Sequence, residues 1–219
     1  MFDSFQEEII LPNINYDEAE EKIERYLEEK YERPFTAIKT ERACTGLGAD
    51  CSKEVRSYFY PNDEEDIQFY AVYHTETSEI TDYFPHSFWE KEIEEDLAKI
   101  LDEHTRVAVY TILDPVEDGV IPYYRDVLGT HITRVSFRKS LRGWEDNDQY
   151  WSKEAEWLIS FKEELLHEGI PEAKMENMEV FVTVANDDDD ESSLTRLYKI
   201  PLNDVTDLEA TTKIIKEYH

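Results

Sequence analysis

Cysteine, glycine, positive charge and long apolar runs are all scarce in this sequence. The 219 residues include two cysteines, six glycines and 23 lysines plus arginines. No stretch approaches the roughly 20 consecutive apolar residues that cross a bilayer, so membrane insertion of the chain as given is not expected. Proteins that bind nucleic acid need a cationic face to neutralise phosphates, and the shortage of positive charge therefore argues against a nucleic-acid partner.

Negative charge is abundant instead. The chain carries 52 aspartates plus glutamates, a formal net charge of −29 and a sequence pI of about 4.4. The favoured interpretation of this charge is a solvated surface that keeps the protein soluble. The alternative is a protein partner with a basic surface, because complementary charge steers association. In that case the chain itself would act as an acidic antagonist, for example an immunity protein that covers a basic toxin.

The apolar content is sufficient for a folded core. Hydrophobic residues make up 40% of the chain and aromatic residues 13%, so disorder is not expected despite the charge. We predict a single domain over residues 1–219. The alternative is a division into residues 1–114 and 120–219, because Pro115 and Gly119 punctuate the segment between them.

Apolar periodicity in the first half predicts a helix, three strands, a helix and a strand. Asn15 and Glu18 form a capping-box-like pair that starts the first helix, and Pro34 ends it. The strand over 106–113 is almost entirely apolar or β-branched, which is typical of a central strand. The three earlier β-rich runs are expected to form an antiparallel meander and lie at 35–43, 54–60 and 67–74.

The second half predicts a strand, a helix, a hairpin and a last helix. Residues 131–138 alternate between apolar and polar, and the following helix over 148–167 ends before Gly169 and Pro171. Two strands at 178–185 and 194–200 form the hairpin, and Thr206 caps the last helix. The second half therefore mixes helices with hairpins, and the chain as a whole is predicted to belong to the α+β class.

Three short segments carry a resemblance to a known group. They are YLEEKYERPFTAI, RSYFYPNDEEDIQFYAVYH and ITDYF, all within Tyr16 to Phe84. This region resembles small uncharacterised α+β proteins of Gram-positive bacteria, many of which are lipoprotein-like. The resemblance implies a helix packed on an antiparallel meander, as in a cystatin-like or similar start, and it implies no activity. The chain departs from the pattern of the group in two respects: we expect no leader or lipobox in the chain as given, and the segment CTGLGADC is inserted.

Cys44 and Cys51 lie in the segment CTGLGADC. At a hairpin tip the two side chains would face each other at a separation that a disulfide can bridge. Two free thiols are an equal alternative, and a metal or redox pair is less favoured because the spacing is not C-x-x-C. Without a leader the chain as given is expected in the cytoplasm, and at the cell surface if a leader was trimmed.

An acidic run between the last two predicted strands is the metal candidate, since Ca²⁺ takes several carboxylate oxygens. No start within the run supplies the glycine and glutamate that an EF-hand loop requires. A solvated hairpin tip is therefore the favoured interpretation, and Ca²⁺ binding the alternative. The run consists of Asp187, Asp188, Asp189, Asp190 and Glu191.

A local basic stretch stands out in this acidic chain: Arg134, Arg138, Lys139 and Arg142, with Trp144 just beyond. On a strand, Arg134 and Arg138 point to the same side. We expect them to form internal ion pairs across a sheet. Binding of an anionic ligand or an acidic partner is the alternative.

Catalytic motifs are missing from the sequence. It contains no G-x-S-x-G, no phosphate-binding P-loop, no dinucleotide-binding glycine pattern and no H-E-x-x-H, so we predict no catalytic or cofactor-binding residues. The leading hypothesis is a non-enzymatic, strongly acidic interaction protein that binds a protein partner. The alternatives are a metal- or carboxylate-dependent hydrolase and a surface-anchored accessory module whose leader has been removed.

Overall fold

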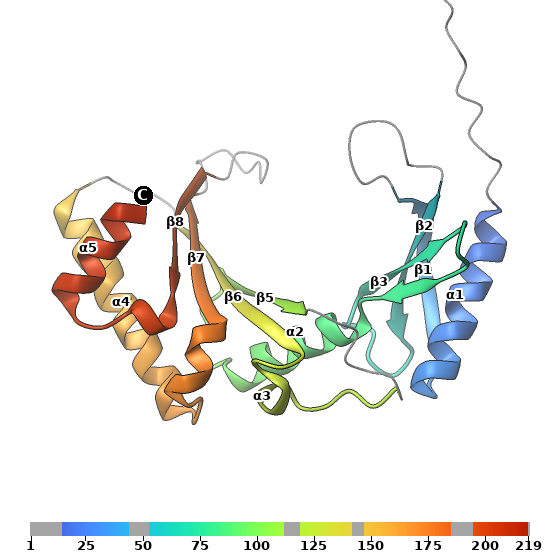
Figure 1. Cartoon of the computed structure of the whole chain (residues 1–219), viewed down its shortest axis with the longest axis horizontal. Coiled ribbons are helices and arrows are strands. Elements are labelled where there is room, and N and C mark those ends of the chain that lie inside the picture. The colour runs from blue at the N-terminus through green and yellow to red at the C-terminus, as the bar shows by residue number, and fades with distance from the viewer. Residues whose placement is uncertain (1–14, 44–52, 112–118, 142–146, 185–194, 219) are drawn as a thin grey trace, which may run out of the picture. The chain divides into compact units, whose positions relative to one another are not determined.

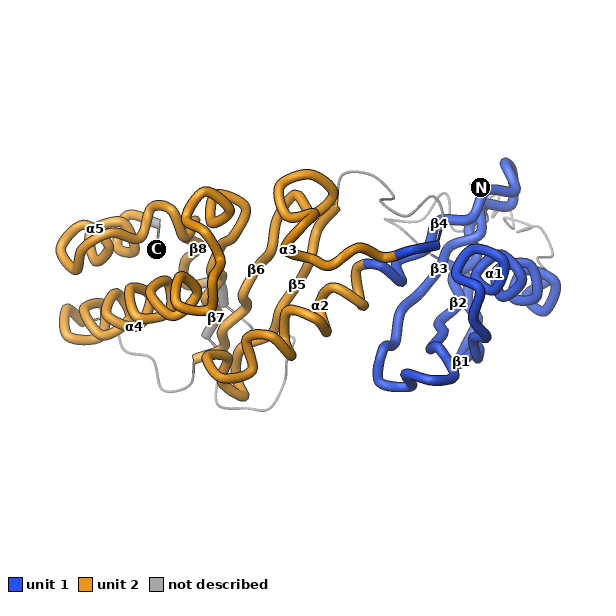
Figure 2. The backbone as a smooth tube through the Cα atoms, turned by 90° about the horizontal axis from the view of Figure 1, so that it is seen from below, with its two compact units in different colours: residues 1–85, 117–120 blue, residues 86–116, 121–219 orange. Residues whose placement is uncertain are grey.

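The structure is a computed structural model and describes residues 15–43, 53–111, 119–141, 147–184 and 195–218. The chain divides into two compact units (Figure 2). Unit 1 comprises residues 1–85 and 117–120, and unit 2 comprises residues 86–116 and 121–219. Helices and two sheets occur together, which confirms the α+β class.

Unit 1 is a helix packed on an antiparallel meander (Figure 1). Helix α1 (Tyr16–Tyr31) precedes four strands that are hydrogen-bonded in chain order. This confirms the predicted helix-on-meander, although the short last strand was not predicted. The strands are β1 (Phe35–Arg42), β2 (Glu54–Pro61), β3 (Phe69–His74) and β4 (Ile80–Asp82).

Local sequence explains both ends of α1. The side chain of Asn15 accepts a hydrogen bond from the backbone N–H of Glu18 at 3.3 Å, as the capping-box pattern predicts. Ala19, Ile23 and Leu27 recur at helical spacing and are buried against the sheet. The helix ends at Glu32, which adopts the left-handed conformation at φ 52°.

Unit 2 is a mixed sheet with its helices packed on one face. The strand order is β5-β6-β7-β8, with β6 and β7 parallel and the other two pairs antiparallel. Helix α4 lies between β6 and β7 in the chain and supplies the crossover that a parallel pair needs. The elements in chain order are α2 (Phe84–Asp96, which begins at the end of unit 1), β5 (Thr105–Thr111), α3 (Tyr124–Val127), β6 (Ile132–Leu141), α4 (Asp148–His167), η1 (Glu172–Asn177), β7 (Met178–Val184), β8 (Thr195–Pro201), η3 (Leu202–Asp204) and α5 (Leu208–Tyr218).

One face of this sheet carries the core of unit 2. Buried side chains alternate along each strand, as Val135 and Phe137 do on β6. They pack with apolar residues of the helices, including Trp89 of α2, Leu158 of α4 and Ile215 of α5. The residues between them, such as Arg138, point to the opposite face, which we call the outer face.

The structure corrects the predicted position of β5. The strand was expected at the centre of a sheet but lies at its edge. Val107 and Val109 are apolar because they pack in the core on one face of the sheet. Their apolar character therefore does not require a neighbouring strand on both sides of β5. At the open edge the backbone N–H of Val109 donates to the Glu90 carboxylate of α2 at 3.0 Å, so a helix side chain replaces the missing strand.

The last helix also begins differently from the prediction. Asp207, rather than Thr206, accepts a hydrogen bond from the backbone N–H of Ala210 at 2.9 Å. Thr206 instead donates its own backbone N–H to the hydroxyl of Thr211.

Within the described ranges, no helix combines the length and the apolar character of a membrane span.

Candidate functional site

The outer face of the unit 2 sheet contains a groove of about 750 Å³, a size within the usual range of ligand sites. All four strands contribute to it. We call it the cationic groove. Its lining residues are Arg106 and Tyr110 of β5, Arg134, Ser136, Arg138 and Ser140 of β6, Glu179, Phe181 and Thr183 of β7, and Lys199 of β8.

The charge of the groove is opposite to that of the whole chain. Four cations line it, Arg106, Arg134, Arg138 and Lys199, against a single carboxylate, Glu179. In the whole chain acidic residues outnumber lysine plus arginine by 52 to 23. A local excess of positive charge in such a chain is not explained by average composition, and a cleft lined by one sign of charge raises the local concentration of ions of the opposite sign.

One end of the groove is occupied by its own carboxylate. Glu179, with a side chain only 10% exposed, lies 2.7 Å from Lys199 Nζ and 3.1 Å from Arg134 Nε. The hydroxyl of Ser136 donates to the same carboxylate at 3.2 Å. The Arg134 guanidinium also lies over the ring of Tyr110, 4.0 Å from its centroid. Two cations therefore balance the charge of this carboxylate, and a hydroxyl donates a hydrogen bond to it.

The other end has two arginines and no carboxylate among its lining residues, although Arg138 interacts electrostatically with Glu90 of α2. Arg106 and Arg138 are direct partners on β5 and β6, and both are exposed. Arg138 donates to the hydroxyl of Tyr110, and Arg106 donates to the backbone carbonyl of Glu103 at 3.0 Å. Among the residues that the structure describes, neither arginine forms an ion pair. Like charges directly opposite each other in a sheet destabilise it unless an anion lies between them.

The predicted basic stretch is divided by the alternation of the strand. Arg134 and Arg138 both line the groove, whereas Lys139 points into the core. Lys139 lies 3.6 Å from Glu154 and over the ring of Trp157, and burial lowers the pKa of its ammonium group despite the nearby carboxylate. Arg142 and Trp144 lie outside the described residues.

The other predicted sites also fall outside the described residues. This applies to Cys44 and Cys51, and to the acidic run at 187–191. Disulfide formation and Ca²⁺ binding therefore stay predictions. Within the described part of the chain, no group of three or more histidine, cysteine, aspartate or glutamate side chains is placed to hold a metal ion.

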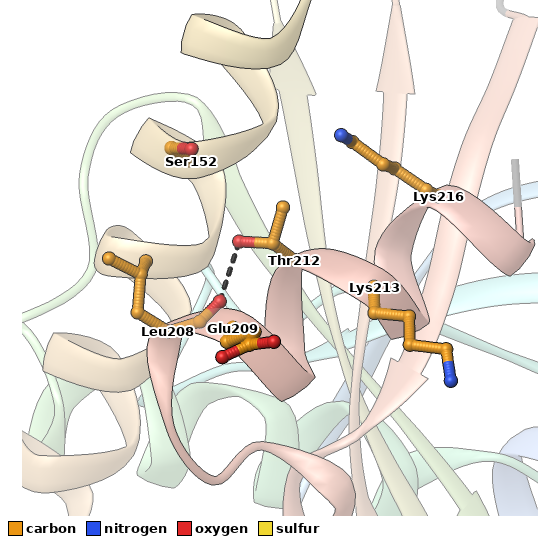
Figure 3. Close-up of a pocket in the computed structure, with 6 residues that line it drawn as sticks. All are labelled: Ser152, Leu208, Glu209, Thr212, Lys213 and Lys216. Carbon is orange, nitrogen blue, oxygen red and sulfur yellow. Dashed lines mark hydrogen bonds between the residues drawn. The ribbon is translucent and has the colours of Figure 1, made fainter.

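A second hollow lies between α4 and α5 (Figure 3). Its lining is mixed in charge, with Glu209 beside Lys213 and Lys216, and Lys216 already pairs with Asp148 at 2.6 Å. The hydroxyl of Thr212 donates to the backbone carbonyl of Leu208, as in an ordinary helix turn. This hollow lacks the one-sided charge of the cationic groove, so substitutions of its charged residues are suitable controls for substitutions in the groove.

Residues from other strands complete the groove and were not predicted. Arg106, Glu179 and Lys199 are far from the basic stretch in sequence, and only strand pairing brings them to it. One signal for the groove was present in the sequence of residues 134–140, RVSFRKS. Arg134 and Ser136 share one strand face, and the same Arg-Ser pair recurs four residues later. A second signal was Glu179, the charged residue in β7, whose sequence MEVFVTV is otherwise uncharged.

The geometry defines the class as an α+β protein with a cationic groove on one sheet face, and comparisons with known proteins add little to it. No protein-family model matches the sequence, and no curated protein matches it either. Among solved structures, the chain is similar to a DUF5037 family protein from Ruminococcus gnavus, with 15% sequence identity and a TM-score of 0.42. The match covers 90% of this chain and 98% of that chain. A likeness at this level assigns neither family nor function, so the function is argued from the groove.

Proposed function

We propose that the protein is a binding protein whose cationic groove takes an acidic segment of a protein partner. The observation that carries this proposal is the pair Arg106 and Arg138, which face each other across β5 and β6 and form no ion pair among the described residues. Arginine presents a planar fork of donors that matches carboxylates, and such charge-assisted hydrogen bonds are among the stronger polar contacts.

Aromatic side chains in the groove also suit a protein partner. Tyr110 and Phe181 lie among the cations and give the groove apolar contact area as well as charge. Arginine and aromatic residues are enriched at the centres of protein interfaces, where they supply much of the binding energy. An extended acidic segment would use both kinds of contact.

The net charge of the chain opposes an acidic partner at long range. At about 0.15 M ionic strength the Debye length is about 8 Å, so distant carboxylates are screened while contacts inside the groove are not. Binding is therefore measured at this ionic strength. A fluorescein-labelled hexaglutamate peptide is the probe, hexaglutamine is the uncharged control, and fluorescence anisotropy reports the bound fraction.

We expect saturable binding of hexaglutamate and none of hexaglutamine. Arg138→Glu reverses a charge in the groove and should reduce the affinity by more than about tenfold. Lys213→Gln removes a cation from the hollow between α4 and α5 and should leave the affinity unchanged. Equal affinity of the Arg138→Glu variant and the native protein would overturn the proposal.

A second candidate rests on the surface of α1. Glu20, Glu21, Glu24 and Glu28 crowd one side of this helix, where burial and the neighbouring carboxylates raise the pKa of Glu24. Such crowding favours a basic partner, in line with the charge of the chain. Its association rate with the native protein would fall steeply with added salt, whereas a rate independent of salt would exclude this candidate.

A further inference from the structure

The two ends of the cationic groove are related by a repeat. Along β6, Arg134 and Ser136 are followed four residues later by Arg138 and Ser140. Along β7, the residue paired with Ser136 is Glu179, and the residue paired with Ser140 is Thr183. Because side chains on one strand face recur every second residue, the repeat places the same donors at two points about 13 Å apart.

The first point shows how this surface binds a carboxylate. Glu179 is held by an arginine and a serine of β6 and by Lys199, the cation of a neighbouring strand. The second point has the corresponding arginine and serine of β6 and also a cation from a neighbouring strand, Arg106. The second cation comes from β5 here and from β8 at the first point, where Tyr110 is the β5 residue opposite Arg134. Thr183 stands where the first point has its glutamate.

From this comparison we infer that Arg106, Arg138, Ser140 and Thr183 form a carboxylate subsite, which receives one glutamate or aspartate side chain of the acidic partner segment. The inference rests on the proposed function and specifies it. The partner's carboxylate takes the role that Glu179 has at the other end, and it relieves the repulsion between the two facing arginines. The shorter side chain of Thr183 leaves the space that the incoming carboxylate needs.

A substitution that supplies this carboxylate from within the chain tests the subsite without any ligand. Thr183→Glu should restore the missing member of the repeat, and Thr183→Gln is the uncharged control of the same size. We expect the Thr183→Glu variant to melt about 2 °C higher than the Thr183→Gln variant. The difference should disappear in an Arg106→Gln, Arg138→Gln background, because the two arginines are its cause.

The same variants test the binding role. In the anisotropy assay, Thr183→Glu should weaken hexaglutamate binding by about tenfold relative to Thr183→Gln, since the subsite is then already filled. A melting difference that persists without the two arginines would overturn the subsite. So would hexaglutamate binding that is equal in the two Thr183 variants.

The outcomes separate this inference from the proposed function. If the native protein binds hexaglutamate but both Thr183 variants bind it equally, the groove binds acidic segments and the subsite is wrong. If the melting difference depends on the arginines but the native protein does not bind hexaglutamate, the subsite is present and the partner segment is wrong. Displacement of the peptide by an equal concentration of free glutamate would also overturn the proposal that the ligand is an acidic protein segment. The ligand would then be a small carboxylic acid.

Discussion

In unit 1 the ammonium nitrogen of Lys30 lies 2.9 Å from a carboxylate oxygen of Asp82, and the two side chains are 8% and 0% exposed. The hydroxyl of Tyr31 donates to the same carboxylate at 2.7 Å, and the backbone N–H of Phe84 donates at 3.3 Å. Lys30 and Tyr31 end α1, and Asp82 ends β4. These contacts join the segments YLEEKYERPFTAI and ITDYF, which the sequence shows only as separate motifs.

Replacing Asp82 by asparagine should destabilise the protein by about 3 kcal/mol, because it removes the buried carboxylate that pairs with the buried ammonium of Lys30. Urea denaturation followed by circular dichroism measures the loss. The control is Glu18→Gln, which removes a largely exposed pair with Lys22 and should leave the stability nearly unchanged. Similar losses for the two variants would contradict the structural role of Asp82.

Two glycines with positive φ make a matched pair. At Gly119, with φ +74°, an added Cβ would lie 1.6 Å from the backbone oxygen of Lys30. At Gly129, with φ +88°, it would lie 3.0 Å from the side-chain nitrogen of Asn177, which can move. We expect Gly129→Ala to lower the free energy of unfolding by about 1 kcal/mol, because of the backbone conformation alone. Gly119→Ala should lower it by more than about 2 kcal/mol, because the added Cβ also meets a backbone atom. Equal unfolding midpoints in urea would contradict the close approach at Gly119.

Glu90 makes a pH-dependent contribution at the edge of β5. Burial raises the pKa of its carboxyl above the ordinary value of 4.5, although the N–H of Val109 partly offsets this. The folded state therefore binds the proton of Glu90 more tightly than the unfolded state does, and protonation stabilises the fold at low pH. This contribution is lost as the pH rises through the folded-state pKa. Glu90→Gln keeps an acceptor for Val109 and removes the charge.

The Glu90→Gln variant should therefore melt about 2 °C above the native protein near pH 7. The difference should vanish below about pH 4.5, where the native carboxyl is protonated in both the folded and the unfolded state. Melting curves recorded across this range decide the point. A gain that is constant with pH would show that ionisation of Glu90 is not its cause.

Removing the internal carboxylate of the groove should strengthen binding of an acidic ligand. Glu179→Gln frees Arg134 and Lys199 from their present partner, so hexaglutamate should bind about fivefold more tightly. Glu209→Gln makes the same change in net charge in the hollow between α4 and α5 and should have little effect. Equal gains for both variants would attribute the effect to net charge instead of the groove.

Much of the secondary structure could be predicted from local sequence. The cap at Asn15 and the apolar spacing of α1 are local signals, and so is the termination of α4 before Gly169. The error at the last helix was also local, because Thr206 and Asp207 both have a side chain suited to capping and only the structure distinguishes them. The position of β5 could not be predicted, since an apolar strand at an edge is possible when a helix side chain binds its free N–H.

The sequence by itself determined that Arg134 and Arg138 share a face of β6, because side chains on a strand alternate with a period of two. It also determined the α+β class through the order of its periodic segments. Only the tertiary structure decided that Arg106 lies opposite Arg138, and that Glu179 lies beside Arg134 while Thr183 lies beside Ser140. Those relationships depend on strand order and register, which arise from long-range pairing around the core. They therefore cannot be predicted from the residue at any one position in the chain.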